Sequence, residues 1–365
     1  MSTFAFIVHP IDPKRDVARK FPWLARILSE RAIHFFSAYF PPVYLSRPRG
    51  IVSQATGEEL QGYLLACPLT AHRMRTLPLE RAYRKIIQTG RLAQRLGADI
   101  LGLGAFTSAI GDAGVTIARA LDIPVTTGDS YTVASAVILA EEVARKMDAP
   151  LQDLHVAVVG ATGSIGRGVA LLLAPRVGHL WILARRPRAL GRVQEEIRDH
   201  APRARVTPST DLADLRHAHL VISATSAPFA VLRPEHLTPG TVVIDMALPR
   251  DATRRLGRHP EYLVLDGGLI QVPGPVDFGF HFGLPRKLAY ACMAETMILA
   301  LEKRFECYTL GKRIDPDKVE QMRAWAANHG FQLASWYSFG HRVGTERIAF
   351  FRERFKQRLR SMVSG

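Results

Sequence analysis

A glycine-rich turn carries the clearest chemistry in this sequence of 365 residues. Residues 155–159 (HVAVV) form an expected buried strand, which runs into Gly160-Ala-Thr-Gly163-Ser-Ile-Gly166 and then an apolar helix. Gly160 permits the tight turn, Gly163 lets the backbone approach a pyrophosphate, and Gly166 lets helix and strand pack closely. The flanking strand and helix favour this interpretation over a purely structural turn. We therefore expect this turn to bind a dinucleotide through Gly160, Thr162, Gly163, Ser164, Ile165 and Gly166.

The end of the next strand indicates which dinucleotide binds. Residues 179–183 (HLWIL) are followed by Ala184, Arg185 and Arg186, with no acidic residue to hold the ribose hydroxyls of NADH. Because arginine accommodates a 2′-phosphate, the sequence favours NADPH, although one of the two arginines would serve equally as a surface charge. Thr225 follows a further strand. A small hydroxyl residue at this place would line the ribose and nicotinamide of the cofactor, but it is an equally good turn former.

A nicotinamide cofactor implies hydride transfer, and two segments offer residues to assist it. Tyr308 and Lys312 match a Tyr-x-x-x-Lys pattern, but an intervening glycine weakens a helix there and we expect a chance match. Cys292 stands near the start of an apolar helix expected over residues 288–305, just after Arg286 and Lys287. A helix N-terminus and nearby cations lower the pKa of a cysteine and make it nucleophilic, whereas an isolated cysteine is more often a buried apolar residue.

The composition is that of a globular protein with a sizeable core. Hydrophobic residues make up 47% and charged residues 22% of the chain, which excludes a disordered protein. The net charge of +15 points to an acidic partner such as an anionic membrane, a phosphorylated ligand or an acidic protein. We expect no nucleic-acid partner, because the basic residues are dispersed without an aromatic platform. With three cysteines and no Cys-x-x-Cys pair, we expect neither a disulfide framework nor a metal site.

The chain contains no apolar run long enough to span a membrane. Its first residues also lack the leading positive charge and long apolar core of a secretory signal. We therefore expect a cytoplasmic protein whose first strand covers residues 4–8.

Alternating strands and helices predict an α/β fold. After residue 151 the alternation is regular enough to predict a Rossmann domain, with a doubly wound parallel sheet. We expect four parts: an N-terminal α/β domain (1–150), the dinucleotide-binding Rossmann domain (151–270), a loop and helical segment with Cys292 (271–335), and a basic C-terminal extension (336–365).

Residues 345–363 within this extension have the pattern of a basic amphipathic helix. Apolar residues recur at spacings of three and four, and arginines and lysines fill much of the remaining surface. The apolar stripe consists of Ile348, Phe351, Phe355, Leu359 and Met362. Such a helix would make peripheral contact with an anionic membrane. Packing of the stripe on the protein's own core is an equally strong interpretation.

Several stretches of the chain are informative when their order and combination are considered together, over roughly residues 4–335. They are LGLGAFTSAIG (101–111), TTGDSYTVASAV (126–137), VAVVGATGSIGRGVA (156–170), VVIDMALPRD (242–251), LDGGLIQV (265–272), LAYACMAETMILALE (288–302) and NHGFQLA (328–334). In this order and combination they resemble the long-chain acyl-(acyl carrier protein) reductase family of cyanobacterial type.

The resemblance implies NADPH-dependent reduction of long-chain fatty acyl thioesters, carried by acyl carrier protein or coenzyme A, to fatty aldehydes. It assigns the family's nucleophile to Cys292 in AYACMAE. The implied thiolate attacks the thioester carbonyl, expels the carrier thiol, and leaves an acyl-enzyme that hydride converts to aldehyde. The N-terminal domain would then hold the acyl chain in an apolar cleft faced by loops 104–108 and 127–132.

Two departures from the family pattern stand out, and the second of them, in a loop, leaves the acyl chain length and the acyl donor open. Asp129 stands where the family pattern has asparagine, and the loop between Gly268 and Cys292 is shorter. Two other functions also stay open. One is a non-covalent NADP-dependent dehydrogenase of short-chain or shikimate type, whose activity would survive loss of Cys292. The other is a non-catalytic NADPH-binding protein associated with membranes.

Overall fold

The computed structural model describes residues 2–363, with side chains described through residue 360, and confirms an α/β fold. The chain forms two compact units. Unit 1 comprises Met1–Tyr131, Ile270–Lys312 and Gln321–Gln332, and unit 2 comprises Thr132–Leu269, Arg313–Glu320 and Leu333–Gly365. The units do not follow the expected boundary near residue 150. Most of helix α8 (Asp129–Lys146) belongs to unit 2, because Val133 packs beside Gly168 of helix α9 (Ser164–Leu173).

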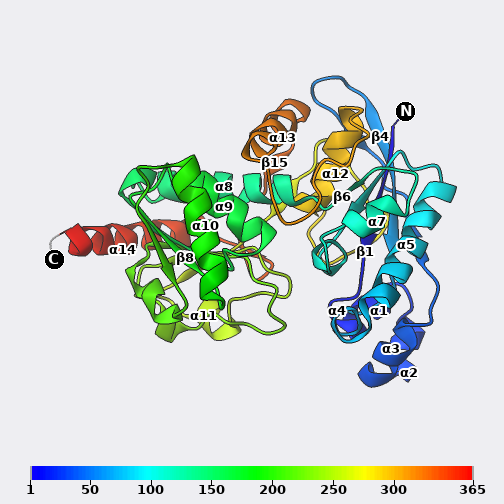
Figure 1. Cartoon of the computed structure of the whole chain (residues 1–365), viewed down its shortest axis with the longest axis horizontal. Helices are drawn as coiled ribbons and strands as arrows, with labels where there is room; N and C mark the ends of the chain where they lie inside the picture. Colours follow the sequence, from blue (N-terminus) through cyan, green and yellow to red (C-terminus); the bar gives the residue numbers. More distant parts are fainter. Residues whose placement is uncertain (1, 364–365) are drawn as a thin grey trace. The chain divides into compact units, whose positions relative to one another are not determined.

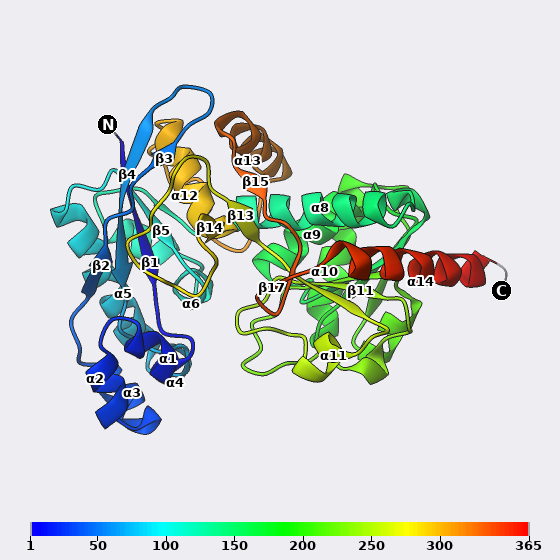
Figure 2. The same cartoon turned by 180° about the vertical axis from the view of Figure 1, so that it is seen from behind.

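Unit 1 contains a mostly parallel sheet with strand order β2-β4-β1-β5-β6 (Figures 1 and 2). Its strands are β1 (Thr3–Val8), β2 (Val43–Ser46), β3 (Ile51–Val52), β4 (Glu59–Ala66), β5 (Ile100–Leu103) and β6 (Val125–Thr126). β1 runs parallel to β4 and β5, and β5 parallel to β6, whereas β2 and β3 are antiparallel to β4. The carboxyl ends of β1, β5 and β6 therefore lie at one edge of the sheet.

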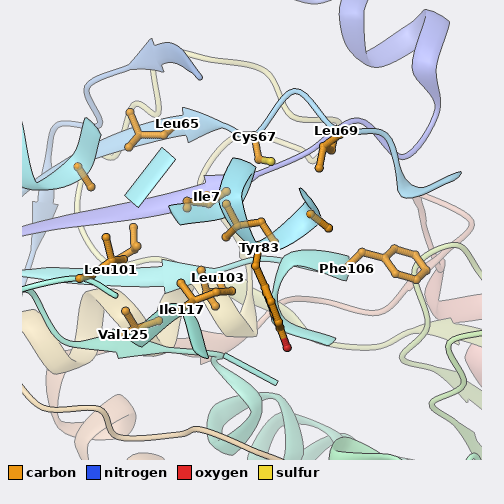
Figure 3. Packing of buried hydrophobic residues seen from close by; sticks show 14 of the residues in the cluster. Ile7, Leu65, Cys67, Leu69, Tyr83, Leu101, Leu103, Phe106, Ile117 and Val125 are labelled. Atoms are coloured by element: carbon orange, nitrogen blue, oxygen red, sulfur yellow. The ribbon is translucent and has the colours of Figure 1, made fainter. Parts of the chain in front are cut away.

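Helices cover both faces of this sheet. Leu101 and Leu103 of β5 pack with Ile86 and other residues of α5 in the core shown in Figure 3. Gly102 faces the opposite side, toward Thr296 of α12, as the alternation of side chains along a strand requires. The helices of this unit are α1 (Pro13–Ala18), α2 (Pro22–Ile27), α3 (Glu30–Ser37), α4 (Ala71–Thr76), α5 (Leu79–Arg95), α6 (Phe106–Ala109), α7 (Val115–Arg119) and α12 (Ala291–Leu301).

Both predicted bounds of the helix expected over residues 288–305 are wrong. Residues Leu288–Tyr290 form strand β14, which pairs with β13 (Leu269–Gln271). Because the backbone is extended there, helix α12 begins only at Ala291 and ends at Leu301. Cys292 is consequently in the first turn of α12.

Unit 2 contains the expected parallel sheet of Rossmann type, with strand order β12-β11-β10-β7-β8-β9. Its strands are β7 (His155–Val159), β8 (His179–Leu183), β9 (Val206–Ser209), β10 (Leu220–Ser223), β11 (Val242–Asp245) and β12 (Leu263–Asp266), and all neighbouring pairs are parallel. Its other helices are α10 (Pro187–His200), α11 (Arg254–Arg258) and α14 (Thr345–Val363). The remaining elements are helix α13 (Pro316–His329) and several short segments: η1 (Leu151–Asp153), η2 (Leu212–His217), η3 (Pro234–His236), β15 (Gln332–Leu333), β16 (Tyr337–Ser338) and β17 (His341–Arg342).

The apolar stripe of α14 packs within unit 2. Phe351 and Phe355 are fully buried, and the Phe355 ring lies 6.0 Å from that of His219. Arg358 is also buried, and its guanidinium donates hydrogen bonds to the carbonyls of Thr238 and Arg216. The structure therefore agrees with packing of this stripe on the protein's own core, while the side chain of Met362 lies outside the described residues. Membrane contact through residues 345–363 stays a prediction.

No helix among residues 2–363 combines the length and apolar character needed to cross a membrane.

Candidate active site

Cys292 lies where the loops after β5 and β6 meet the first turn of α12. Gly128 follows β6 with φ +76°, a conformation that glycine adopts without strain. A Cβ atom on Gly128 would lie 2.3 Å from Cys292 Cα and 2.4 Å from Cys292 Cβ. The turn over residues 127–131 therefore contacts the backbone of Cys292 directly, and only glycine leaves room for this contact. The two loops that the sequence placed along an acyl-chain cleft, 104–108 and 127–132, each contribute a residue beside Cys292, namely Ala105 and Gly128; the cleft itself stays a prediction.

The charge state of Cys292 differs from the sequence expectation. Burial raises the pKa of its thiol to about 12, and the carboxylates of Asp129 and Glu295 raise it further. The backbone amides of Met293 and Ala105 face the sulfur and favour the thiolate, but they do not offset burial. The expectation of a lowered pKa is wrong, because Arg286 and Lys287 are exposed and precede β14. At neutral pH the resting side chain is a thiol.

The loop that brings Ala105 to the sulfur is strained and held by a histidine. Ala105 has φ +49° and ψ −123°, a region that residues other than glycine rarely occupy. The next amide, that of Phe106, donates to Nε2 of His9 over 3.0 Å. The opposite ring nitrogen, Nδ1, lies 3.2 Å from the carbonyl of Pro10 and donates to it. Burial lowers the pKa of His9 to about 4, so a neutral imidazole fixes this loop.

Glu295, one helical turn after Cys292, is a buried carboxylate that ties three segments together. Its Oε1 accepts hydrogen bonds from the hydroxyls of Thr126 at 2.6 Å and Thr309 at 2.9 Å. Its Oε2 accepts from the backbone amide of Tyr131 at 2.8 Å. Glu295 is fully buried, which raises its pKa. These bonds hold the 126–131 segment, and thus Gly128, against α12. Sequence reasoning missed this role; a glutamate at i+3 within an otherwise apolar helix was the available signal.

The glycine turn of unit 2 has the shape that a pyrophosphate requires. A Cβ atom on Gly160 would lie 2.5 Å from the Ala224 carbonyl oxygen, and one on Gly166 would lie 2.4 Å from the Gly160 oxygen. Gly163 is exposed, and a Cβ atom on it would lie 3.3 Å from the nearest atom, the Gly160 carbonyl oxygen. Helix α9 begins at Ser164 without a side-chain cap at its N-terminus, so the first amides, including those of Ile165 and Gly166, remain available for an anion.

Arg185 and Arg186 follow β8 at the same carboxyl edge of the sheet. Both are exposed, and neither forms an ion pair with another residue in the described part of the chain. Two free guanidinium groups at this position fit a 2′-phosphate. Thr162 is half-buried within the glycine turn itself.

Thr225 lies beside the glycine turn, but its hydroxyl already has a hydrogen-bond partner within the protein. Its Cα would be 3.2 Å from a Cβ on Gly160, as expected for a residue near the cofactor. Its hydroxyl, however, donates to the buried carboxylate of Asp251, which also accepts from Ser223 at 2.7 Å. Asp251 thus fixes the loop after β10, a role that the sequence did not indicate.

The remaining candidate residues fall outside these sites. Tyr308 is buried and Lys312 follows it in a non-helical segment, so the Tyr-x-x-x-Lys geometry of a helix is not formed. Cys67 is buried in the core of unit 1, and Cys307 is exposed. Among residues 2–363, no group of three or more His, Cys, Asp or Glu side chains is placed to hold a metal ion.

Comparisons with known proteins agree with the cofactor site. Residues 141–266 match the family model of shikimate / quinate 5-dehydrogenase. A long-chain acyl-[acyl-carrier-protein] reductase from Synechococcus elongatus is 28% identical over 351 residues, covering 90% of this chain and 98% of that protein. The aminotransferase PigE of Serratia sp. is 33% identical over 306 residues, covering 81% of this chain but 35% of PigE. The chain thus spans about a third of the length of PigE.

Among solved structures, the chain resembles a quinate dehydrogenase from Corynebacterium glutamicum in complex with NAD, with 14% identity and a TM-score of 0.36 over 98% of this chain and 99% of that one. A shikimate 5-dehydrogenase from Listeria monocytogenes gives 9% identity and a TM-score of 0.36 over 88% and 96% of the two chains.

Unit 2 is a Rossmann-type unit with a site for an NAD(P) cofactor. The family-model match falls on the part of the chain that contains the glycine turn, β8 and Thr225. The cofactor site is built from backbone amides and arginines, and its residues fit NADPH.

Proposed function

We propose that the protein reduces long-chain fatty acyl thioesters to aldehydes through an acyl-enzyme on Cys292. The observation that carries this proposal is the placement of Cys292 in the first turn of α12, with the amides of Met293 and Ala105 facing its sulfur. A site meant only to pack a cysteine has no need of a strained backbone at Ala105. The similarity to the Synechococcus elongatus reductase over 90% of this chain supports the same substrate class.

The chain's own residues account for the acyl-transfer half of the reaction. The sulfur of Cys292 attacks the thioester carbonyl carbon, a new carbon–sulfur bond forms, and the bond to the carrier thiolate breaks. The thiol proton must leave first, because the resting side chain is protonated. We assign it to Asp129, which directly follows Gly128 in the turn that contacts Cys292 and whose charge raises the pKa of this thiol. The proton then passes to the departing thiolate, so that the carrier leaves as a free thiol.

A reduced nicotinamide, when bound, supplies the hydride that converts an acyl thioester to an aldehyde. The glycine turn and the first amides of α9 would hold its pyrophosphate, and Arg185 and Arg186 its 2′-phosphate. The acyl donor is acyl carrier protein or coenzyme A, and the exposed arginines of a chain with net charge +15 suit either acidic carrier.

The test is the mass of the intact protein after mixing with a long-chain acyl thioester in the absence of NADPH. We expect one acyl adduct, which peptide mapping places on Cys292 and which NADPH removes with release of aldehyde. Cys292→Ala should lose both the adduct and the aldehyde. Cys307→Ala is the matched control, because Cys307 is an exposed thiol outside the site, and it should behave as the unmodified protein does.

The same experiment separates this proposal from a non-covalent dehydrogenase of shikimate type, which the family-model match to residues 141–266 favours. That alternative predicts no adduct from either acyl donor, and NADP-dependent oxidation of a hydroxyl substrate that survives Cys292→Ala. Such a result would refute the acyl-enzyme.

A further inference from the structure

Most of the large apolar side chains that stand exposed on the described residues lie in one short stretch of unit 1. They belong to α2, α3 and the segment after α3, which Figures 1 and 2 show lying together beside α1 and α4. We call them the α2–α3 surface: Trp23, Ile27, Phe35, Phe36, Tyr39 and Phe40. Trp23 is 61% exposed, Ile27 74% and Tyr39 69%. Exposed apolar patches of this kind mark interaction sites.

This exposure follows from the amphipathic pattern of α3. Ile33 and Ser37, one turn apart, are buried against unit 1. Phe35, Phe36 and Tyr39 therefore fall on the outer side of the helix. The Phe35 ring lies 5.3 Å from that of Phe36 and 5.5 Å from that of Tyr39, so the rings form a continuous apolar cluster.

Basic side chains are exposed in the same stretch of unit 1 as this cluster. Lys14, Arg15, Lys20, Arg26 and Arg31 are all exposed in the same stretch, where they outnumber the acidic residues Asp12, Asp16 and Glu30. Arg26 directly precedes Ile27 at the end of α2, and Arg31 stands in the first turn of α3, one helical turn before Phe35. The surface thus combines aromatic side chains, which favour the boundary between water and lipid, with cations that attract anionic headgroups.

We propose that the α2–α3 surface docks the protein on an anionic lipid bilayer. The aromatic and aliphatic side chains insert at the level of the headgroups, and Arg26 and Arg31 pair with lipid phosphates. A carrier protein recognised by charge alone would not need exposed aromatic rings packed on one another beside these cations in the sequence, so the bilayer is the favoured partner. The inference does not depend on the proposed reductase activity. It also assigns membrane contact to a surface other than α14, in which Phe351 and Phe355 of the apolar stripe are buried.

The experiment measures binding of the full-length protein to vesicles without substrate or cofactor. We expect sedimentation with vesicles of phosphatidylcholine containing phosphatidylglycerol, much weaker binding to phosphatidylcholine alone, and a loss of binding as salt increases. Lipids brominated on their acyl chains should quench the fluorescence of Trp23, and Trp23→Phe should abolish that part of the quenching.

Two variants test the two components of the surface separately. Phe35→Ser with Phe36→Ser removes the apolar component, and Arg26→Glu with Arg31→Glu reverses the charge; each should weaken vesicle binding by about tenfold or more. Phe229→Ser is the matched control, because Phe229 is 69% exposed in unit 2, and it should bind as before. Circular dichroism checks that each variant is folded.

Four results would overturn the proposal. One is the absence of vesicle binding by the unchanged protein, and a second is binding that persists in both variants. The third is a dimer in solution that the Phe35 and Phe36 changes dissociate without effect on vesicles, since this surface would then be an interface between two copies of the chain. If instead the charge reversal abolishes binding to an acyl carrier protein and leaves vesicle binding unchanged, the partner is the carrier.

Discussion

The cysteine site of unit 1 and the glycine turn of unit 2 occupy equivalent places, at the carboxyl ends of parallel strands, but they are built differently. The glycine turn is one continuous segment, residues 160–166, and its binding groups are the first backbone amides of α9, which have no side-chain cap. The cysteine site joins segments near residues 9, 105, 128, 292 and 309, and a buried carboxylate holds part of it together. Unit 2 can accept a ligand without losing internal bonds, whereas each group around Cys292 is fixed by another residue.

The largest expected effect comes from removing the carboxylate that holds the cysteine site. Glu295→Ala removes the acceptor of the Thr126 hydroxyl and of the Tyr131 amide, and leaves the Thr309 hydroxyl with only that of Ser130. We expect a loss of about 3 kcal/mol in the free energy of unfolding, measured by thermal or urea denaturation. Glu295→Gln keeps an acceptor oxygen and should lose less.

The matched control is Glu306→Ala, which removes an exposed carboxylate of the same unit and should change stability by under about 0.5 kcal/mol. Affinity for NADPH should be unchanged in all three variants if the two sites are as independent as their construction indicates. Equal stability of Glu295→Ala and the unchanged protein would contradict the structural role of this residue.

Gly128→Ala tests the close contact at the nucleophile. The added methyl group would meet the backbone of Cys292 at 2.3 to 2.6 Å and must displace it. Because a displacement of about 1 Å can cost a reaction a hundredfold, we expect the rate of acyl-adduct formation to fall by about that factor, measured by mass spectrometry over time.

Gly97→Ala separates crowding from backbone strain. Gly97 also has a positive φ, +80°, but a Cβ there would meet nothing within 4 Å. The Gly97→Ala variant should be modestly less stable than the unchanged protein, and its acyl adduct should form at the same rate as in that protein. An equal loss of rate in both variants would indicate strain rather than contact with Cys292.

A smaller effect is expected from the arginines of unit 2. Replacing Arg185 and Arg186 together by alanine should weaken NADPH binding by about tenfold, or about 1.4 kcal/mol, and leave NADH binding unchanged. Isothermal titration calorimetry measures both. Arg188→Ala, which removes another exposed arginine of α10, should alter neither. A parallel loss for NADPH and NADH would mean that the arginines act on the pyrophosphate and not on the 2′-phosphate.

The smallest effect concerns pH, and it applies to both units. Burial lowers the pKa of His9 in unit 1 to about 4 and of His219 in unit 2 to about 3. The unfolded chain therefore binds protons first, so stability falls as pH drops below about 6.5 and continues to fall toward pH 4. Between pH 7 and pH 6 each histidine should account for roughly 0.7 kcal/mol, measured by unfolding at each pH.

His200→Gln, at an exposed histidine, should leave this pH dependence unchanged. A free energy of unfolding that stays constant between pH 7 and pH 5 would show that neither buried histidine resists protonation.

The sequence predicted the glycine turn and its sheet well because the signals are local. Strands β7 and β8 have the bounds that alternation and apolar runs indicated, and the turn follows directly from its glycines. The start of α12 was not predicted, because LAYACMAE fits an apolar helix as well as a buried strand followed by one. Only pairing with β13 separates the two. Neither the role of Glu295 nor the direction of the Cys292 pKa shift could be predicted, since both depend on segments far apart in the chain.

The backbone conformation at Ala105 lowers the stability of the fold and at the same time contributes to the cysteine site. Its φ of +49° costs an alanine roughly 1 to 3 kcal/mol, and the same conformation presents an amide to the Cys292 sulfur. Glycine would adopt it freely, but would also let the loop explore other shapes. Selection for robustness would therefore favour glycine at this position, and selection for turnover would retain a side chain. Among natural variants, the residue found here should report which of the two pressures has dominated.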